Sequence, residues 1–223
     1  YEISTAFLSQ MNTGGVAFLL TRTLTDHIPR ARGAALYQEG ESGDWSRVRV
    51  YVPDAQDPLR ARWQKGETWA GEDLILSLCK RKQHQVFISR DQGQALPILE
   101  TFPVEDGKPA MVYIPLVLPD RTVWGVIALM LRGGSAVQGY EATLLQAIVQ
   151  QGTAAITRAK LYEKSQTNES QMQAILESSR DGLILVGDDQ TIRYINGQAL
   201  KLLNLSGPPT PWVNRPLDAF RRA

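Results

Sequence analysis

Few side chains of this 223-residue chain have the types and spacing that chemistry requires. Cys79 is the single cysteine, so no intrachain disulfide can form, and its thiol is the first candidate for covalent chemistry. The two imidazoles, those of His27 and His84, lack a ligand-like spacing to it. No Ser-His-Asp pattern, phosphate-binding glycine loop or dinucleotide fingerprint is present either. The sequence therefore predicts no metal site and no catalytic activity for these residues.

Charge and hydropathy narrow the choice of partners. The formal net charge is +1, which gives no general attraction to nucleic acid or to membranes. The basic run 80–82 is interpreted as the cationic end of a helix. No apolar run approaches the roughly 18 residues of a membrane span. We expect a cytoplasmic protein with no nucleic-acid or membrane contact in these residues, although an anchor upstream of Tyr1 stays open.

Helical spacing of apolar residues predicts two helices before the middle of the chain. The first covers residues 1–28 in two pieces, interrupted by the Asn-Thr-Gly-Gly sequence at 12–15 and ended by Pro29. The second covers residues 73–82. We expect its buried side to consist of Leu74, Ile75, Leu78 and Cys79.

Five segments read as strands, namely 34–37, 47–52, 86–88, 111–118 and 123–131. The last two are apolar on both faces, which indicates central strands covered on both sides. We expect a bulge or an unpaired position where proline interrupts the fourth strand, at Pro115. In the second strand, alternation predicts one shared face for Val48, Val50 and Val52.

A long loop and a long helix complete this part of the chain. Residues 90–108 form a loop of the length that often serves as a lid or binding loop. A helix begins at Tyr140, and its apolar residues lie near a seven-residue repeat, which predicts pairing with a second copy of the chain. The seam residues are Leu145, Ile148, Ala155, Ala159 and Tyr162.

This element order predicts an α+β fold built on an antiparallel sheet. The first and last helices would cover one face of the sheet. The short helix and the long loop would cover the other face.

The order of the motifs resembles a GAF domain from about residue 1 to residue 164. The motifs are YEIS, VRVYV, KGETWAG, VFISRD and MVYIPLVLPDRTVWGVIALM, followed by the final helix. The resemblance implies a small-molecule sensor, a light sensor or a plain dimerisation module of a signalling protein.

Residues 168–223 resemble the first half of a PAS domain. The carrying motifs are ESQMQAILESS, the Asp-Gly step into LILV, the turn GDDQ, the strand IRYI, the cap Asn196 and WVNRPLDAF. The remaining PAS strands would lie beyond Ala223. The helix at 139–177 would connect the two domains.

The GAF resemblance places a ligand pocket around the short helix and the sheet. The pocket residues that it implies are Trp69, Leu78, Cys79, Phe87, Ile114 and Leu116. The lid-loop residues that it implies are Arg90, Leu96 and Phe102.

Three chemistries known in GAF domains are weighed against these residues. A bilin would need a thiol with a neighbouring His, but Lys80 follows Cys79 and no DIP-type triplet is present, which favours a buried structural thiol. Cyclic-nucleotide binding would need an NKFDE-like set of residues, which the sequence lacks. Trp69 and Phe87 are more simply explained as core residues. Methionine sulfoxide reduction needs several cysteines. No cofactor is predicted, and any ligand is left unidentified.

Together the two resemblances imply the sensory input region of a signal-transduction protein, first of all a histidine kinase of a two-component phosphorelay. This region would form a homodimer through its terminal helices, with a kinase or another output domain farther along the same chain. The alternatives are a ligand-free dimerisation scaffold, or the input region of a diguanylate cyclase or a transcription regulator.

Overall fold

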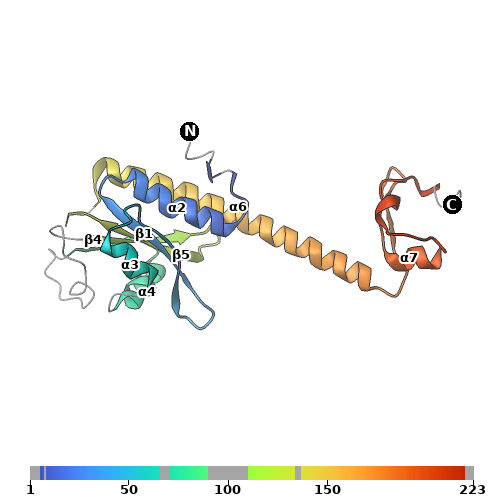
Figure 1. Ribbon diagram of the computed structural model, residues 1–223, viewed down its shortest axis with the longest axis horizontal. Coiled ribbons are helices and arrows are strands. Elements are labelled where there is room, and N and C mark those ends of the chain that lie inside the picture. Colours follow the sequence, from blue (N-terminus) through green and yellow to red (C-terminus); the bar gives the residue numbers. More distant parts are fainter. Residues whose placement is uncertain (1–5, 8, 66–70, 90–109, 134–136, 219–223) are drawn as a thin grey trace. The chain divides into compact units, whose positions relative to one another are not determined.

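The computed structural model describes residues 6–7, 9–65, 71–89, 110–133 and 137–218 (Figure 1). The chain divides into two compact units, residues 1–163 and 164–223. Each unit has a core of its own, so each is described by itself.

Unit 1 is built on a five-stranded antiparallel sheet of order β2-β1-β5-β4-β3. The predicted α+β class is therefore confirmed. The central strands β4 and β5 are almost entirely buried on both faces, as their continuous apolar sequence predicts. The strands are β1 (Ala31–Glu39), β2 (Trp45–Tyr51), β3 (Val86–Ser89), β4 (Ala110–Val117) and β5 (Val123–Leu131).

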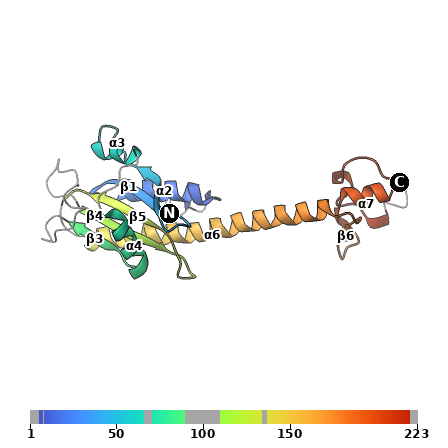
Figure 2. The same cartoon turned by 90° about the horizontal axis from the view of Figure 1, so that it is seen from below.

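One face of the sheet is covered by the first and last helices of the unit, as expected. They are α2 (Thr13–His27) and the 40-residue α6 (Gly139–Ser178), which lie side by side (Figures 1 and 2). Asn12 caps α2 by accepting a hydrogen bond from the backbone N–H of Gly15 at 2.6 Å. Residues 6, 7 and 9 are helical and residues 10–12 are not, so the predicted division into two pieces is confirmed, with the break at 10–12 instead of 12–15.

The buried side of α6 corrects the predicted dimer seam. Leu145, Ile148, Ala155 and Ala159 are at most 3% exposed and pack in the core between the sheet and α2. These four residues are buried within unit 1 and cannot contact a second chain. Tyr162 alone of the predicted seam is exposed, at 45%.

The other face of the sheet carries the short helices α3 (Pro58–Gln64) and α4 (Glu72–Lys82). The buried residues of α4 are Glu72, Ile75, Leu76 and Cys79, which follow the spacing of one helical stripe. Leu74 is 77% exposed and Leu78 is only half-buried. The buried side of α4 therefore differs from the predicted one by a rotation of about one residue around the helix axis.

A β-bulge changes the faces of β2. The ladder pairs Leu36 with Arg49 and then Tyr37 with Arg47, which leaves Val48 as the extra residue. Because a bulge shifts the alternation by one, Arg47 and Val50 point to the same side of the sheet. Val48 is exposed, contrary to the predicted alternation.

A second irregularity lies near the proline of β4. Pro115 keeps its register opposite Val126, and the ladder shifts only after Leu116, where Trp124 becomes the extra residue. The predicted irregularity is therefore present, but it lies just beyond the proline and on the partner strand.

Unit 2 consists of the end of α6, β6 (Ile184–Val186), β7 (Ile192–Ile195), α7 (Gly197–Leu202) and a 3-10 turn at Thr210–Trp212. Asn196 is fully buried at its centre. Its Oδ1 accepts from the N–H groups of Leu183 and Ala199, both at 2.9 Å. Its Nδ2 donates to the carbonyls of Leu176 at 3.0 Å and Asp181 at 2.9 Å. All four hydrogen-bonding positions of the amide are used, so one side chain ties α6, β6 and α7 together.

Both units contain the same three-residue hairpin turn. In unit 1, Asp120 Oδ1 accepts from the N–H and hydroxyl of Thr122, at 3.0 and 2.6 Å. In unit 2, Asp189 Oδ1 accepts from the N–H and hydroxyl of Thr191, at 3.2 and 2.6 Å. These hydrogen bonds lower the pKa of both carboxyl groups. The residue between Asp and Thr is left-handed in each turn, with φ of +64° and +59°.

Gly152 of α6 packs tightly against Leu20 of α2. A Cβ atom there would lie 2.6 Å from Cδ1 of Leu20, well inside contact distance. We expect Gly152→Val to lower the free energy of unfolding of unit 1 by about 1–3 kcal/mol through overpacking. Thermal and urea unfolding would measure the change. Ala154→Val on the exposed side of the same helix is the control, and an equal loss in both variants would contradict the assignment.

Candidate functional site

The residues predicted to line one pocket lie on two faces of the sheet. Phe87, Ile114 and Leu116 belong to the core beneath α2 and α6. Cys79 belongs to the core beneath α3 and α4, together with Tyr113 of β4. Because alternate residues of a strand point to opposite faces, Ile114 and Cys79 cannot line one cavity. Trp69 and the lid residues Arg90, Leu96 and Phe102 lie outside the described residues.

Cys79 has the surroundings of a structural thiol. Its side chain is fully buried, and Sγ lies 3.4 Å from the carbonyl oxygen of His84 and 3.5 Å from that of Tyr113. Burial raises the pKa of this thiol to about 12, so it stays protonated near neutral pH and is a poor nucleophile. Among the described residues, no group of three His, Cys, Asp or Glu side chains is placed to hold a metal ion.

A buried polar cluster that the sequence did not reveal lies on the α3 and α4 face. We call it the Arg47 cluster; its other members are Tyr37, Trp63, Glu72 and Tyr113. Arg47 donates from Nε to the Tyr37 hydroxyl and from Nη1 to the Trp63 carbonyl, both at 2.9 Å. Its Nη2 lies 3.9 Å from Glu72 Oε2, and the Tyr113 hydroxyl donates to Glu72 Oε1 at 3.2 Å.

Burial controls the electrostatics of the Arg47 cluster. The pKa values of Tyr37 and Tyr113 are raised well above the usual range by burial and then by the nearby Glu72 carboxylate, so both phenols stay neutral. The guanidinium carbon of Arg47 lies 5.2 Å from the Tyr37 ring centroid and 5.9 Å from that of Trp63. These large side chains fill the face on which the predicted pocket was centred. The sequence alternation places Arg47 on the same side as Arg49, and only the bulge at Val48 turns Arg47 to the buried side.

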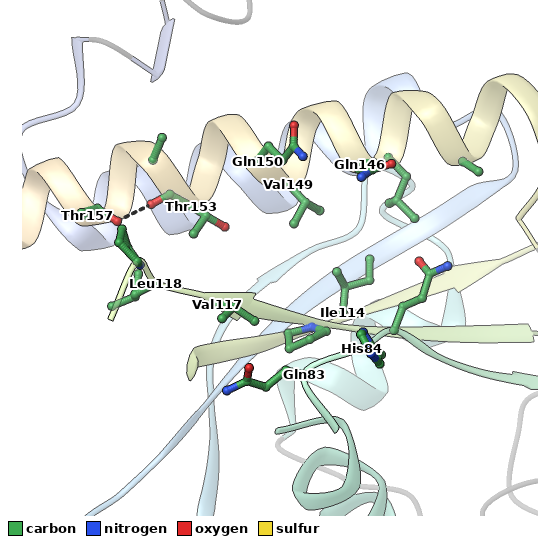
Figure 3. Close-up of a pocket in the computed structure, with 16 residues that line it drawn as sticks. Gln83, His84, Ile114, Val117, Leu118, Gln146, Val149, Gln150, Thr153 and Thr157 are labelled. Atoms are coloured by element: carbon green, nitrogen blue, oxygen red, sulfur yellow. Dashed lines mark hydrogen bonds between the residues drawn. The ribbon is translucent and has the colours of Figure 1, made fainter. Parts of the chain in front are cut away.

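A groove of about 720 Å³ lies on the other face, between α6 and β4 (Figure 3). The helix contributes one side from Ala142 to Thr157, and the segments 83–85 and 114–119 contribute the other. Figure 3 shows Gln146, Val149, Gln150 and Thr153 of α6 across from Ile114, Val117 and Leu118 of the strand, with Gln83 and His84 beyond it.

The groove has an apolar floor and a rim of polar side chains, without carboxylates, lysines or arginines. Ile114, Leu118 and Leu145 are buried at its floor, with Val149 half-buried beside them. Amides of glutamine surround this floor, and none of the sixteen lining residues is Asp, Glu, Lys or Arg. A volume of this size is typical of small-molecule sites, and the lining favours a neutral ligand with an apolar body and hydrogen-bonding edges. The amides at the rim are Gln83, Gln85, Gln146 and Gln150.

The groove exists because two helices cover five strands. α2 lies against β1 and β2, whereas the groove separates α6 from β4. Five strands span about 24 Å, whereas two packed helices cover about 20 Å. Among the described residues, no helix is both long enough and apolar enough to cross a membrane.

Comparison with known proteins gives a family match for part of the chain and a fold likeness for unit 1. The model of the PAS domain family matches residues 170–222. No curated protein sequence matches the chain. The predicted GAF-plus-partial-PAS organisation is supported by the structural neighbours of unit 1 and by this family match.

Solved structures show the GAF-like fold of unit 1. GAF3 of a Synechocystis protein, in its photoproduct state, is 16% identical with a TM-score of 0.52, covering 65% of this chain and 96% of that one. The GAF domain of an Acinetobacter phosphoenolpyruvate-protein phosphotransferase is 12% identical with a TM-score of 0.50, covering 72% and 91%. A chain of the Escherichia coli DhaR(N)–DhaL complex is 19% identical with a TM-score of 0.50, covering 98% and 70%. At these identities the likeness concerns the fold.

We expect Arg47→Met to lower the free energy of unfolding of unit 1 by about 3 kcal/mol, because it leaves the Glu72 carboxylate buried beside an uncharged side chain. Urea unfolding would measure the loss. Arg49→Met on the exposed side of β2 is the matched control, with an expected effect below about 0.5 kcal/mol. The double variant Arg47→Met/Glu72→Leu should regain part of the stability. Equal losses in Arg47→Met and Arg49→Met would show that the cluster is not a stabilising unit.

Proposed function

We propose that this chain, a GAF-like unit followed by a PAS segment, is the sensory input region of a signal-transduction protein. Unit 1 receives the signal as a bound small molecule, and α6 transmits the resulting change to unit 2. The residues themselves catalyse no reaction.

The observation that carries this proposal is the continuity of α6. This single helix supplies buried residues to the core of unit 1 and its last turn to unit 2. A helix propagates a rotation or a tilt along its length, because every turn is hydrogen-bonded to the next. A change at one end of α6 therefore reaches the other end without an intervening loop.

Side chains hold α6 in unit 1 at both ends of its buried stretch. Near its beginning, Glu141 accepts from Nε and Nη2 of Arg30, the second at 2.6 Å. Before α6 leaves the unit, Glu163 Oε1 accepts from the N–H of Thr13 at 2.8 Å, at the first residue of α2. The orientation of α6 is thus tied to β1 and to α2.

The last turn of α6 is held just as closely in unit 2. The Leu176 carbonyl accepts from Asn196 Nδ2, and Glu177 accepts from the Tyr194 hydroxyl at 3.1 Å and the Gly197 N–H at 3.3 Å. A movement of this turn must shift β7 and the start of α7, because these hydrogen bonds join them directly.

The uncharged groove supplies the input site. Its α6 side is the part of the helix that faces away from α2, so a ligand there contacts the transmitting element itself. The Arg47 cluster fills the space beside Cys79 beneath α3 and α4, which supports the groove over the pocket expected from the sequence.

We propose a functional class for the output domain of the protein. A sensor histidine kinase of a two-component system is the first choice, since GAF and PAS domains commonly form the input of such proteins. A diguanylate cyclase and a transcription regulator use the same input architecture. A scaffold that binds no ligand and only dimerises is the alternative from another functional class.

We expect Thr153→Trp, which fills the groove with an indole ring, to change hydrogen exchange in unit 2. The amides to follow are those of Leu183 and Ala199, both held by Asn196, and they should exchange faster. The matched control is Gln151→Trp, on an exposed side of α6 outside the groove.

Two double variants test whether the change passes from unit 1 to unit 2 along α6. Glu169→Gly/Ser170→Gly weakens α6 between the units, since each glycine costs about 1 kcal/mol in a helix, and it should abolish the effect of Thr153→Trp. Glu169→Ala/Ser170→Ala should preserve it. If Thr153→Trp leaves the unit 2 amides unchanged, the transmission mechanism is wrong and the ligand-free scaffold becomes the better explanation.

We also propose that the chain forms a homodimer through α6. The contact would use an exposed apolar stripe of this helix that differs from the seam expected from the sequence. Leu161, Met172 and Ile175 are 65%, 63% and 69% exposed. With Asn168 they follow intervals of seven, four and three residues, the repeat of a coiled coil.

We expect Ile175→Glu to weaken self-association of the chain by about tenfold or more, because a carboxylate would enter an apolar helix seam. Sedimentation equilibrium would measure the dissociation constant. Ser170→Glu, on the opposite side of α6, should leave it unchanged. A chain that stays monomeric at all accessible concentrations would refute the homodimer.

A further inference from the structure

A second depression, of about 660 Å³, lies where the end of α4 meets the hairpin between β4 and β5. It is separate from the groove, although Gln83 borders both. Its lining is polar and largely cationic. The lining residues are Glu39, Ser77, Lys80, Arg81, Gln83, Arg121, Thr122 and Val123.

The depression carries more positive than negative charge. Lys80 forms an ion pair with Glu39, the one carboxylate among the lining residues. The guanidinium groups of Arg81 and Arg121 then remain as two further cations, and both residues are exposed. This concentration is local, because the whole chain has a net charge of only +1.

Within the part of the chain that the structure describes, Arg121 forms no ion pair. The adjacent carboxylate, Asp120, is turned into its own hairpin and accepts from the N–H and the hydroxyl of Thr122. The position of lysines and arginines at the end of α4 suits the helix dipole, but that explanation does not extend to Arg121, which comes from a hairpin.

The backbone holds the two sides of the depression together. Gln83 and Arg121 are both left-handed, with φ of +54° and +64°. The side-chain amide of Gln83 donates to the carbonyl of Arg121 at 2.7 Å. Glycine is the usual residue at the left-handed position of such a three-residue hairpin, so arginine is held there at a conformational cost.

Ser77 adds a neutral donor to this arrangement. Its Oγ accepts from Trp45 Nε1 at 3.1 Å, which orients the hydroxyl and leaves its proton for another acceptor. Two guanidinium groups, one hydroxyl and a paired ammonium are the donors that bind oxyanions, and arginine matches the geometry of a phosphoryl group.

We propose that this depression binds the phosphoryl group of a small phosphorylated molecule, with Arg81 and Arg121 as the principal ligands. The site differs in charge and position from the groove on α6, so it does not depend on the function proposed above. The site lies on α4 and on the hairpin between β4 and β5 of unit 1.

Titration calorimetry of the 223-residue chain with inorganic pyrophosphate tests the proposal. We expect binding that weakens about tenfold or more in Arg121→Gly and in Arg81→Gln, through loss of charge-assisted hydrogen bonds. Arg121→Gly also places the preferred residue at the left-handed position, so it should fold at least as stably as the original chain.

Gln190→Gly is the matched control, because it makes the same backbone change in the same turn of unit 2. It should bind pyrophosphate with unchanged affinity. Citrate, a carboxylate anion, should bind more weakly than pyrophosphate at equal ionic strength. The proposal is overturned if the original chain does not bind pyrophosphate, if Arg121→Gly binds it equally well, or if citrate binds as tightly.

Discussion

The structure depends on one constraint, namely that a single helix must satisfy two cores. Between Leu145 and Ala159, α6 buries an apolar side against the sheet and α2. At its last turn, the same helix gives the Leu176 carbonyl to Asn196, which is fully buried. A displaced α6 would expose apolar surface in unit 1 or break hydrogen bonds in unit 2. Both losses cost free energy, so the position of the helix is set jointly by elements that are distant in sequence.

The two faces of the sheet in unit 1 have different physical characters. The face beneath α3 and α4 is closed by a polar cluster in which Arg47 and Glu72 satisfy each other and two tyrosine hydroxyls. Buried polar groups of this kind specify one packing, because any rearrangement leaves a donor or acceptor unpaired. The face beneath α6 has an apolar floor and an open groove. It can accept a new molecule without loss of existing hydrogen bonds, which makes it the more adaptable face.

Much of this architecture could be predicted from the sequence. The strands at Ala110–Val117 and Val123–Leu131 are apolar on both faces, and only central strands have that pattern. The candidate site was harder to predict, because it depends on one-residue details. The bulge at Val48 turns Arg47 inward, and alternation along β4 separates Ile114 from Cys79. Periodicity also could not tell whether the seam of α6 would face its own sheet or a second chain, since both need apolar residues at the same intervals.

The missing side chain at Gly152 gives α6 a mechanical property. Leu20 of α2 occupies the space that a Cβ atom at residue 152 would need, and this tight contact can serve as a fulcrum for α6. From there to Ser178 the helix is about 39 Å long, at about 1.5 Å per residue. A tilt of about 5° at the fulcrum would move the end of this lever by about 3 Å, roughly the length of one hydrogen bond. Asn196 donates to the Leu176 carbonyl at this end, so a change too small to disturb the core of unit 1 would carry Asn196 and its partners along with the helix.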